Sequence, residues 1–279
     1  DVASAISIAQ DALRNPTDYY IDYCFKETLK HLQSLTTDSV APTDPVLLAS
    51  FISKLDDREL LALSPATEPI LFARLERRSY DVSAREKILA DLAKLHGTTR
   101  GDELFAALRR LDARGGGVAG AIGELAKAVA MSSKAAVLND RAAYLDLASQ
   151  ATQGVTRRLA YAAVLISDGN VEGAWEAAKS GPGREALVQA ISIVTDPTIR
   201  VQFQTKLVDL AGSASGSMLR AVQSALPLMG VAHAEENFAL LSKHVVEGRE
   251  RASAANAIMQ IPRAAWKKEL AAGVCEAVL

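Results

Sequence analysis

The sequence predicts an all-α protein, built as an α-solenoid of stacked antiparallel helix pairs. Apolar residues recur at the i, i+4, i+7 spacing of a helix face, and no segment shows the sustained alternation that is typical of strands. Glycine and proline are also scarce: Gly 17 and Pro 9 together make 26 of 279 residues, below the average of roughly 12%. This deficit favours long helices over turn-rich β architecture.

The apolar spacing places helices along the whole chain. In each of five windows, three or four apolar side chains share one helix face and are expected to be buried. The sets are Leu48, Ile52 and Leu55; Ile88, Leu92 and Leu95; Leu104, Leu108 and Leu111; Ile199, Phe203, Leu207 and Leu210; Ala234, Phe238, Leu241 and Val245.

Helix starts are marked by side chains that accept the free amide hydrogens of a first turn. Asp44 and Asp196 each precede a proline, which is the arrangement of an N-cap followed by proline at the first helical position. Ser83 and Glu86 have the spacing of a capping box. We therefore expect helices to begin at these three places.

Breaks between helices are predicted where turn-forming residues cluster, at 34–43, 114–117, 167–170, 180–183 and 212–216. Helices of roughly 10 to 18 residues joined by short connections would result. We expect a single helical-repeat domain over 1–279, with two sub-stacks, 1–113 and 118–279, as the alternative.

A weak internal repeat supports stacking. The order acid, leucine, alanine recurs at irregular spacing, at 91–93, 124–126, 146–148, 209–211 and 269–271. A helix pair cannot bury its apolar stripe alone, whereas stacked neighbours can. The interpretation is a HEAT-like solenoid. A one-off helical bundle is the alternative, because this short string is also common in ordinary helices.

Charge and composition exclude several classes of function. With 31 basic and 33 acidic residues the net charge is -2, so we expect no nucleic-acid partner. No run of about 18 apolar residues exists, so no transmembrane segment is predicted. The chain begins at Asp1 without an apolar leader, as a mature product or an excised piece of a longer protein would.

The cysteines and histidines are scattered. Cys24 and Cys275 lie near opposite ends and outside any CxxC or Cys/His cluster, so we predict no disulfide and no zinc site, and expect both to be small buried hydrophobes. His31, His96 and His244 lie where helices are expected to end, and the helix dipole favours an imidazolium there.

Two short motifs match known sites only in form. Gly115, Gly117 and Gly120 fit G-x-G-x-x-G, but a dinucleotide site needs a preceding strand and 102–114 has a helical pattern. The His-Ala-Glu triplet at 233–235 fits the H-x-E of zinc deaminases, but no Pro-Cys-x-x-Cys follows. We therefore predict no catalytic, cofactor-binding or metal-binding residue, and do not expect an enzyme.

Arginines supply one candidate partner-binding surface. The densest basic grouping is Arg74, Arg77, Arg78 and Arg85, followed by Arg109, Arg110 and Arg114. If the two helices that carry them are neighbours, the guanidinium groups would line one edge and bind carboxylates or phosphates of an anionic partner. The alternative is a solvated face in which acidic residues lie between the arginines.

Tyrosines supply a second candidate surface. Tyr19, Tyr20 and Tyr23 cluster on the second predicted helix. They would form a docking surface for a protein partner, because tyrosine combines apolar area with a polar tip. Core packing against the first helix is the alternative.

The first third of the chain resembles a known family. The stretch that opens Asn15-Pro16-Thr17-Asp18-Tyr19-Tyr20 and runs over 15–30, together with 69–77, 80–97 and 103–112, looks like the HEAT-like helical-repeat segment of large PVC-type haem-binding multidomain proteins. In that family the segment lies between a propeller-type dehydrogenase domain and a cytochrome c module. The chain lacks CxxCH and propeller strands, so no haem ligand or dehydrogenase residue is carried over.

The expected function is that of a non-catalytic interaction or spacer module, which holds protein partners or neighbouring domains of a larger protein. The alternative, implied by the resemblance, is a structural part of a periplasmic haem-containing or dehydrogenase assembly for electron transfer, whose chemistry lies outside this chain. The resemblance also implies a periplasmic or secreted location, with the cytoplasm as the other option. Self-association through the apolar end helices is a further expectation.

Overall fold

Helices account for 77% of the residues described, and strands are absent from that part of the chain. The computed structural model describes residues 1–115, 119–131, 141–179 and 181–278. The prediction of an all-α fold is confirmed. The chain divides into two compact units, Asp1–Thr98 and Thr99–Leu279. The stacking of helix pairs into a solenoid stays a prediction, and residues 116–118 of the expected sub-stack boundary lie outside the described part.

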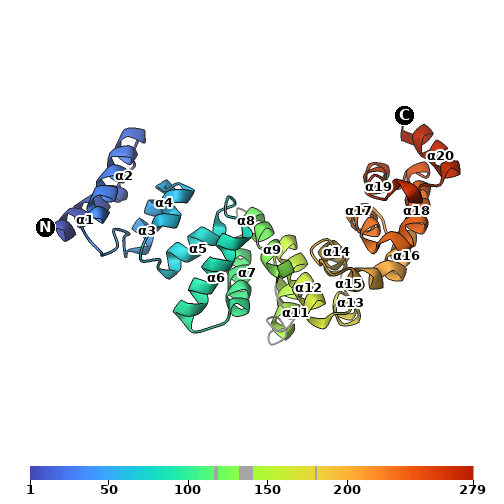
Figure 1. Cartoon of the computed structure of the whole chain (residues 1–279), viewed down its shortest axis with the longest axis horizontal. Helices are drawn as coiled ribbons and strands as arrows, with labels where there is room; N and C mark the ends of the chain where they lie inside the picture. The colour runs from blue at the N-terminus through green and yellow to red at the C-terminus, as the bar shows by residue number, and fades with distance from the viewer. Residues whose placement is uncertain (116–118, 132–140, 180, 279) are drawn as a thin grey trace. The chain divides into compact units, whose positions relative to one another are not determined.

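The first unit is coloured from blue to teal in Figure 1. Its elements are α1 (Val2–Asp11), the 3-10 helix η1 (Ala12–Arg14), α2 (Tyr19–Ser34), α3 (Pro45–Lys54), α4 (Asp57–Ala62), α5 (Glu68–Glu76) and α6 (Val82–His96). Several of these helices are shorter than the sequence pattern suggested, because 43–67 is divided between two helices and two loops.

The second unit runs from green to red in Figure 1. Its elements are α7 (Arg100–Arg114), α8 (Ala119–Glu124), α9 (Ala126–Met131), α11 (Arg141–Gln150), α12 (Gly154–Asp168), α13 (Glu172–Ala177), α14 (Gly181–Ala190), α15 (Pro197–Arg200), η2 (Val201–Phe203), α16 (Gln204–Ser213), α17 (Gly216–Ala225), η3 (Leu226–Met229), η4 (Val231–His233), α18 (Ala234–Val246), α19 (Arg251–Ile258), η5 (Arg263–Ala265) and α20 (Lys268–Val278).

The two caps that precede prolines form as predicted. The Asp44 carboxylate accepts the amides of Val46 and Leu47 at 2.9 Å each and starts α3. Asp196 accepts the amide of Thr198 at 2.8 Å and starts α15. Local sequence is enough to predict these starts, since cap and acceptor lie within three residues of each other.

The capping box predicted at Ser83 and Glu86 is wrong. Helix α6 begins at Val82, and its N-cap is Asp81, whose carboxylate accepts the Ala84 amide at 2.8 Å. Asp81 stands two residues before Ser83, so the helix starts before the serine is reached. The break expected at 180–183 also lies elsewhere, because α13 ends at Ala177 and α14 begins at Gly181.

One apolar cluster of the first unit lies between α1, α2, α3 and α4 and extends to Ile70 of α5. Phe25 and Phe51 meet edge to face with ring centroids 6.2 Å apart, and Leu60 is fully buried. The apolar face of α1 packs against this core, with Ile6 partly buried in it. One predicted core residue is wrong: Leu95 is 54% exposed, because the apolar face of α6 ends one turn earlier.

The second unit is organised around α12, which packs against α11 and α14. Helix α14 also contacts α17, and α17 contacts α19. A continuous series of helix contacts therefore runs from α12 through α14 and α17 to α19. Alanines are frequent among the buried residues of these helices. Ala160 and Ala162 of α12 and Ala174 of α13 have no exposed surface. Small side chains let the neighbouring helices approach closely. In the part of the chain described, no helix is both long and apolar enough to span a bilayer.

Candidate functional site

Arg74, the first of the predicted partner-binding arginines, is buried and stabilises the fold. The Arg74 side chain is only 6% exposed, and its Nε donates a hydrogen bond to the Leu60 carbonyl at 3.0 Å. Its Nη2 donates to the carbonyls of Leu61 and Leu63 at 3.1 and 2.7 Å. Burial lowers the pKa of the guanidinium. Arg74 therefore closes the C-terminal end of α4 and lies inside the unit, away from the exposed edge where the sequence placed it.

Arg77 has a similar role. Its Nη2 donates to the carbonyls of Ile52 and Leu55 at 3.0 Å each, and its Nε lies 3.5 Å from the Asp57 carboxylate. Arg78, the next residue, is exposed. Of the three predicted partner-binding arginines of the first unit, therefore, Arg78 is exposed, Arg77 is partly exposed and Arg74 is buried.

Arg85 completes this set of internal arginines. It is 1% exposed and donates to the carbonyls of Leu75 and Tyr80 at 2.6 and 3.2 Å, and also to that of Arg77. A planar guanidinium with five donors suits this position, since it can satisfy three carbonyls at once where α5 ends.

The other predicted arginines belong to the second unit. Arg109 and Arg110 are exposed on α7, and the Arg109 guanidinium lies 5.9 Å from the centre of the Phe105 ring. The boundary between the two units falls between the two arginine groups, so the groups belong to different units. Binding of an anionic partner by Arg78, Arg109 and Arg110 stays a prediction.

The tyrosine cluster is fully on the surface. Tyr19 and Tyr20 are each 76% exposed and Tyr23 is 58% exposed, on the outer face of α2. The rings of Tyr19 and Tyr20 meet edge to face, with centroids 5.6 Å apart. The alternative of core packing is thus wrong for these residues. We name Tyr19, Tyr20 and Tyr23 the tyrosine face.

Three contacts with neighbouring helices hold α2 in an orientation that leaves the tyrosine face outward. The Lys54 ammonium of α3 lies 2.6 Å from the Asp22 carboxylate, and both contact the Thr17 hydroxyl. Phe25 packs on the core one turn further along. Lys26 then lies 2.9 Å from the Glu59 carboxylate of α4. With one side of the helix bound to α3 and α4, the tyrosines at the start of α2 face solvent.

The Asp22 carboxylate is electrostatically tuned by this arrangement. The hydrogen bond from Lys54, and then that from Thr17, lower the pKa of Asp22 below its ordinary value. Asp22 is therefore ionised at neutral pH and holds Lys54 as a fixed partner. Because Asp22 stands in the same helical turn as Tyr20 and Tyr23, this pair holds the part of α2 that carries the tyrosine face against α3.

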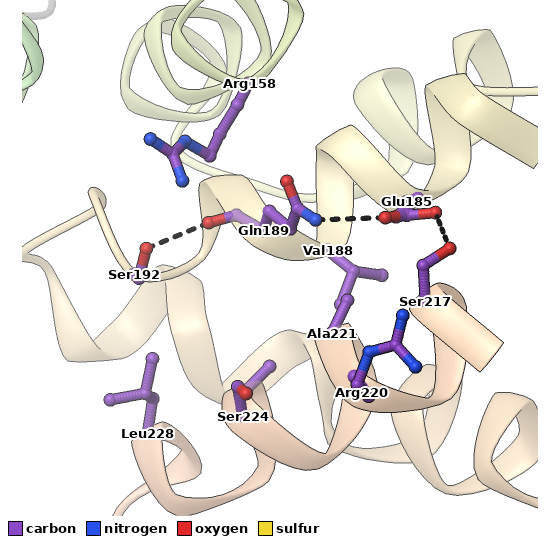
Figure 2. A pocket seen from close by; sticks show the side chains of 11 residues that line it. Arg158, Glu185, Val188, Gln189, Ser192, Ser217, Arg220, Ala221, Ser224 and Leu228 are labelled. Atoms are coloured by element: carbon purple, nitrogen blue, oxygen red, sulfur yellow. Dashed lines mark hydrogen bonds between the residues drawn. The ribbon is translucent and has the colours of Figure 1, made fainter. Parts of the chain in front are cut away.

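A second feature, in the second unit, was not singled out from the sequence. A hollow of about 460 Å³ lies between α12, α14 and α17 and η3. Figure 2 shows its lining, in which Arg158 of α12 faces Gln189 and Ser192 on the other side. Arg158 could not be singled out from the sequence, since it is one of two adjacent arginines in an ordinary helical stretch.

The prediction that both cysteines are buried is wrong: Cys24 and Cys275 are exposed, and both are free thiols. Cys24 follows the exposed Tyr23 on α2, and its side chain is exposed like that of Tyr23. The next residue, Phe25, is the one that turns into the core. Among residues with assigned positions, no group of three His, Cys, Asp or Glu residues has the geometry of a metal site.

His244 does not act as the charged helix cap that its position suggested. It is 1% exposed, with Gln223 Nε2 3.3 Å from its Nδ1 and Arg249 Nη1 3.3 Å from its Nε2. Burial, and then the charge of Arg249, lower the pKa of this imidazole, so it is neutral near pH 7. Burial outweighs the helix dipole here.

The two formal motifs do not gather into a site. Gly115 follows the end of α7 with φ of 74°, while residues 116–118, which include Gly117, lie outside the described part. His233 lies 3.5 Å from the Glu236 carboxylate at the start of α18, as an ordinary first-turn pair does.

Comparison of the chain with models of known protein families, with curated proteins and with solved structures finds no match. The resemblance to haem-binding multidomain proteins, and the exported location that it implies, therefore stay predictions. The features of the structure that bear on function are the tyrosine face of α2 and the hollow beside Arg158.

Proposed function

We propose that this chain is a non-catalytic helical interaction module, which holds a protein partner or a neighbouring domain against the tyrosine face of α2. The observation that carries the proposal is the exposure of Tyr19, Tyr20 and Tyr23 together within the first two turns of one helix. Single exposed apolar residues are normal on a protein surface, whereas clusters of aromatic rings are typical of docking sites.

The composition of the face favours a protein surface as the occupant. A tyrosine buries a large apolar area while its hydroxyl still finds a hydrogen-bond partner at the edge of an interface. Tyrosine also has few rotatable bonds, so that little conformational entropy is lost on docking. The edge-to-face contact between Tyr19 and Tyr20 restricts both rings further.

The rigidity of the helix gives a second line of support. The pairs Asp22–Lys54 and Lys26–Glu59 bind α2 to α3 and α4, and neither pair involves a tyrosine side chain. A surface that is already fixed before the partner arrives loses less freedom on binding, which raises affinity.

Site-specific photo-crosslinking tests the proposal. A photoreactive phenylalanine analogue replaces Tyr20 in the full chain, inside the cells that produce it, and the adducts are identified by mass spectrometry. The matched control carries the same group at Val231, which is 80% exposed in the second unit. We expect one defined polypeptide to be trapped from position 20 and not from position 231.

Two outcomes would count against the proposal. The first is an absence of adducts at position 20 while a non-specific crosslinker still gives adducts of the chain under the same conditions. The tyrosine face would then have no partner. The same set of adducts at both positions would show that the contact is unspecific. A trapped second copy of the chain would identify the partner as self-association.

A further inference from the structure

The hollow beside Arg158 has the form of a binding site for a small ligand. Its volume of about 460 Å³ falls within the range in which proteins hold small molecules. Apolar side chains of Val188, Ala221 and Leu228 form part of the lining, and polar groups stand around them. Figure 2 shows the guanidinium end of Arg158 extending away from the α12 ribbon into this region.

Among the residues that the structure describes, Arg158 has no counter-charge. Its Nε is shielded from solvent and has no hydrogen-bond acceptor, and no carboxylate among the described residues lies within ion-pair distance of it. Burial alone lowers the pKa of this guanidinium. A partly desolvated charge without a partner is unfavourable, and the fold retains it here.

The other charged groups of the lining have hydrogen-bond or ion-pair partners of their own. The Glu185 carboxylate accepts hydrogen bonds from Gln189 Nε2 at 3.1 Å and from the Ser217 hydroxyl at 2.6 Å, as the dashed lines in Figure 2 mark. Arg220 Nη1 lies 2.8 Å from the Glu250 carboxylate. The charge that a ligand would complement is thus that of Arg158.

We propose that this hollow binds a small monocarboxylic acid with an apolar body, whose carboxylate pairs with Arg158 and whose carbon chain lies against Leu228 and Ala221. A guanidinium offers two parallel donors that match one carboxylate. Of the two arginines in the lining, Arg158 alone has no ion pair among the described residues, and one guanidinium matches one carboxylate; a phosphate dianion would meet stronger repulsion from Glu185 than a monoanion does. This site lies in the second unit and is independent of the tyrosine face.

Calorimetric titration of the whole chain with three probes tests the class of ligand. Sodium hexanoate is expected to bind with a dissociation constant of about 1 mM or tighter, and to do so at least about tenfold more tightly than neutral hexanamide or inorganic phosphate. Equal binding of hexanoate and hexanamide would overturn the role of Arg158. Phosphate binding as tight as hexanoate, or no hexanoate binding at all, would overturn the proposed ligand class.

Two variants locate the site. Arg158→Met keeps the length of the apolar stem and is expected to weaken hexanoate binding at least about tenfold. Arg220→Met removes a lining guanidinium that is already paired with Glu250, and should change the affinity by less than about threefold. Equal effects of both changes would overturn the assignment to Arg158.

Thermal unfolding separates a binding role from a structural one. Because Arg158 is unpaired, Arg158→Met should leave the midpoint of the ligand-free chain unchanged or raise it, as replacement of an uncompensated charge by an apolar residue does. Hexanoate should raise the midpoint of the wild type and leave that of the variant unchanged. A lower midpoint for the ligand-free variant, with hexanoate stabilising both proteins equally, would overturn the proposal.

Discussion

Replacing Asp112 by alanine should unfold the start of α12. Asp112 lies at the end of α7 and is 9% exposed. Its two carboxylate oxygens accept the backbone amides of Thr152 and Gln153 at 2.9 Å each, and the Thr152 hydroxyl at 3.2 Å. Asp112 thus fixes, from a distant helix, the two residues that lead into α12, where the cap residue Gln153 makes no side-chain cap bond of its own. We call this contact the cross-helix cap.

The magnitude follows from the bonds that would be lost. A hydrogen bond to a charged group contributes about 1.5–3 kcal/mol, and water will satisfy part of the need of an amide near the surface. We therefore expect Asp112→Ala to lower the free energy of unfolding by about 2–4 kcal/mol. Asp112→Asn should cost about half as much, since its single carbonyl oxygen can accept only one of the two amides well.

Urea denaturation followed by circular dichroism measures the change, and hydrogen exchange of peptides from α7 and α12 locates it. Asp146→Ala is the control, because Asp146 is exposed on neighbouring α11 and accepts only from Gln150 within its own helix. It should change the free energy by less than about 0.5 kcal/mol. If Asp112→Ala behaves like this control, the cross-helix cap contributes nothing and the reasoning fails.

Three further changes probe the remaining electrostatics. Arg85→Lys should destabilise the first unit by about 2–4 kcal/mol in urea denaturation, because one ammonium cannot serve the three carbonyls that the buried guanidinium holds. The depressed pKa of Asp22 means that its pair with Lys54 stabilises above pH of about 3.8 and is lost as pH falls below it; Asp22→Asn should flatten the stability curve there. The depressed pKa of His244 means that the unfolded chain takes up a proton first, so stability should fall as pH drops below about 6.5, and His244→Gln should remove this slope.

Parts of the fold that depend on neighbours in sequence could be predicted. The caps at Asp44 and Asp196 lie within three residues of the amides that they bind. The face of α18 that carries Phe238 and Leu241 is buried as its spacing indicates. The weak repeat is less reliable, since its second copy, at 124–126, lies across the junction of α8 and α9.

The roles of the charged residues could not be predicted, because their partners are distant in the chain. Arg74 is internal because the end of α4 presents three carbonyls to it across a loop. Asp112 finds its amides forty residues away. Arg158 and the neighbouring Arg157 look alike in sequence, yet Arg157 donates to the Ala151 carbonyl while Arg158 faces the hollow.

The exposed tyrosines show the same limit from the other side. Helical spacing groups Tyr19 with Tyr23 and marks Phe25, Leu29 and Leu32 as the buried stripe of α2, but it does not say whether another helix covers the tyrosines. The decision comes from Asp22, whose partner Lys54 lies on α3, and from Phe25, which meets Phe51. Both contacts join segments that are about thirty residues apart, so only the folded unit fixes the outward direction of the tyrosines.

The affinity of the trapped partner for tyrosine-face variants tests the central claim most directly. With the partner identified by crosslinking at position 20, its dissociation constant is measured against the wild type, Tyr20→Ala and the control Val231→Ala. We predict that Tyr20→Ala costs about 2 kcal/mol, a weakening of roughly 30-fold, while the control stays within about twofold. Equal affinities for the wild type and Tyr20→Ala, with the chain still folded, would contradict the claim that the tyrosine face is the binding surface.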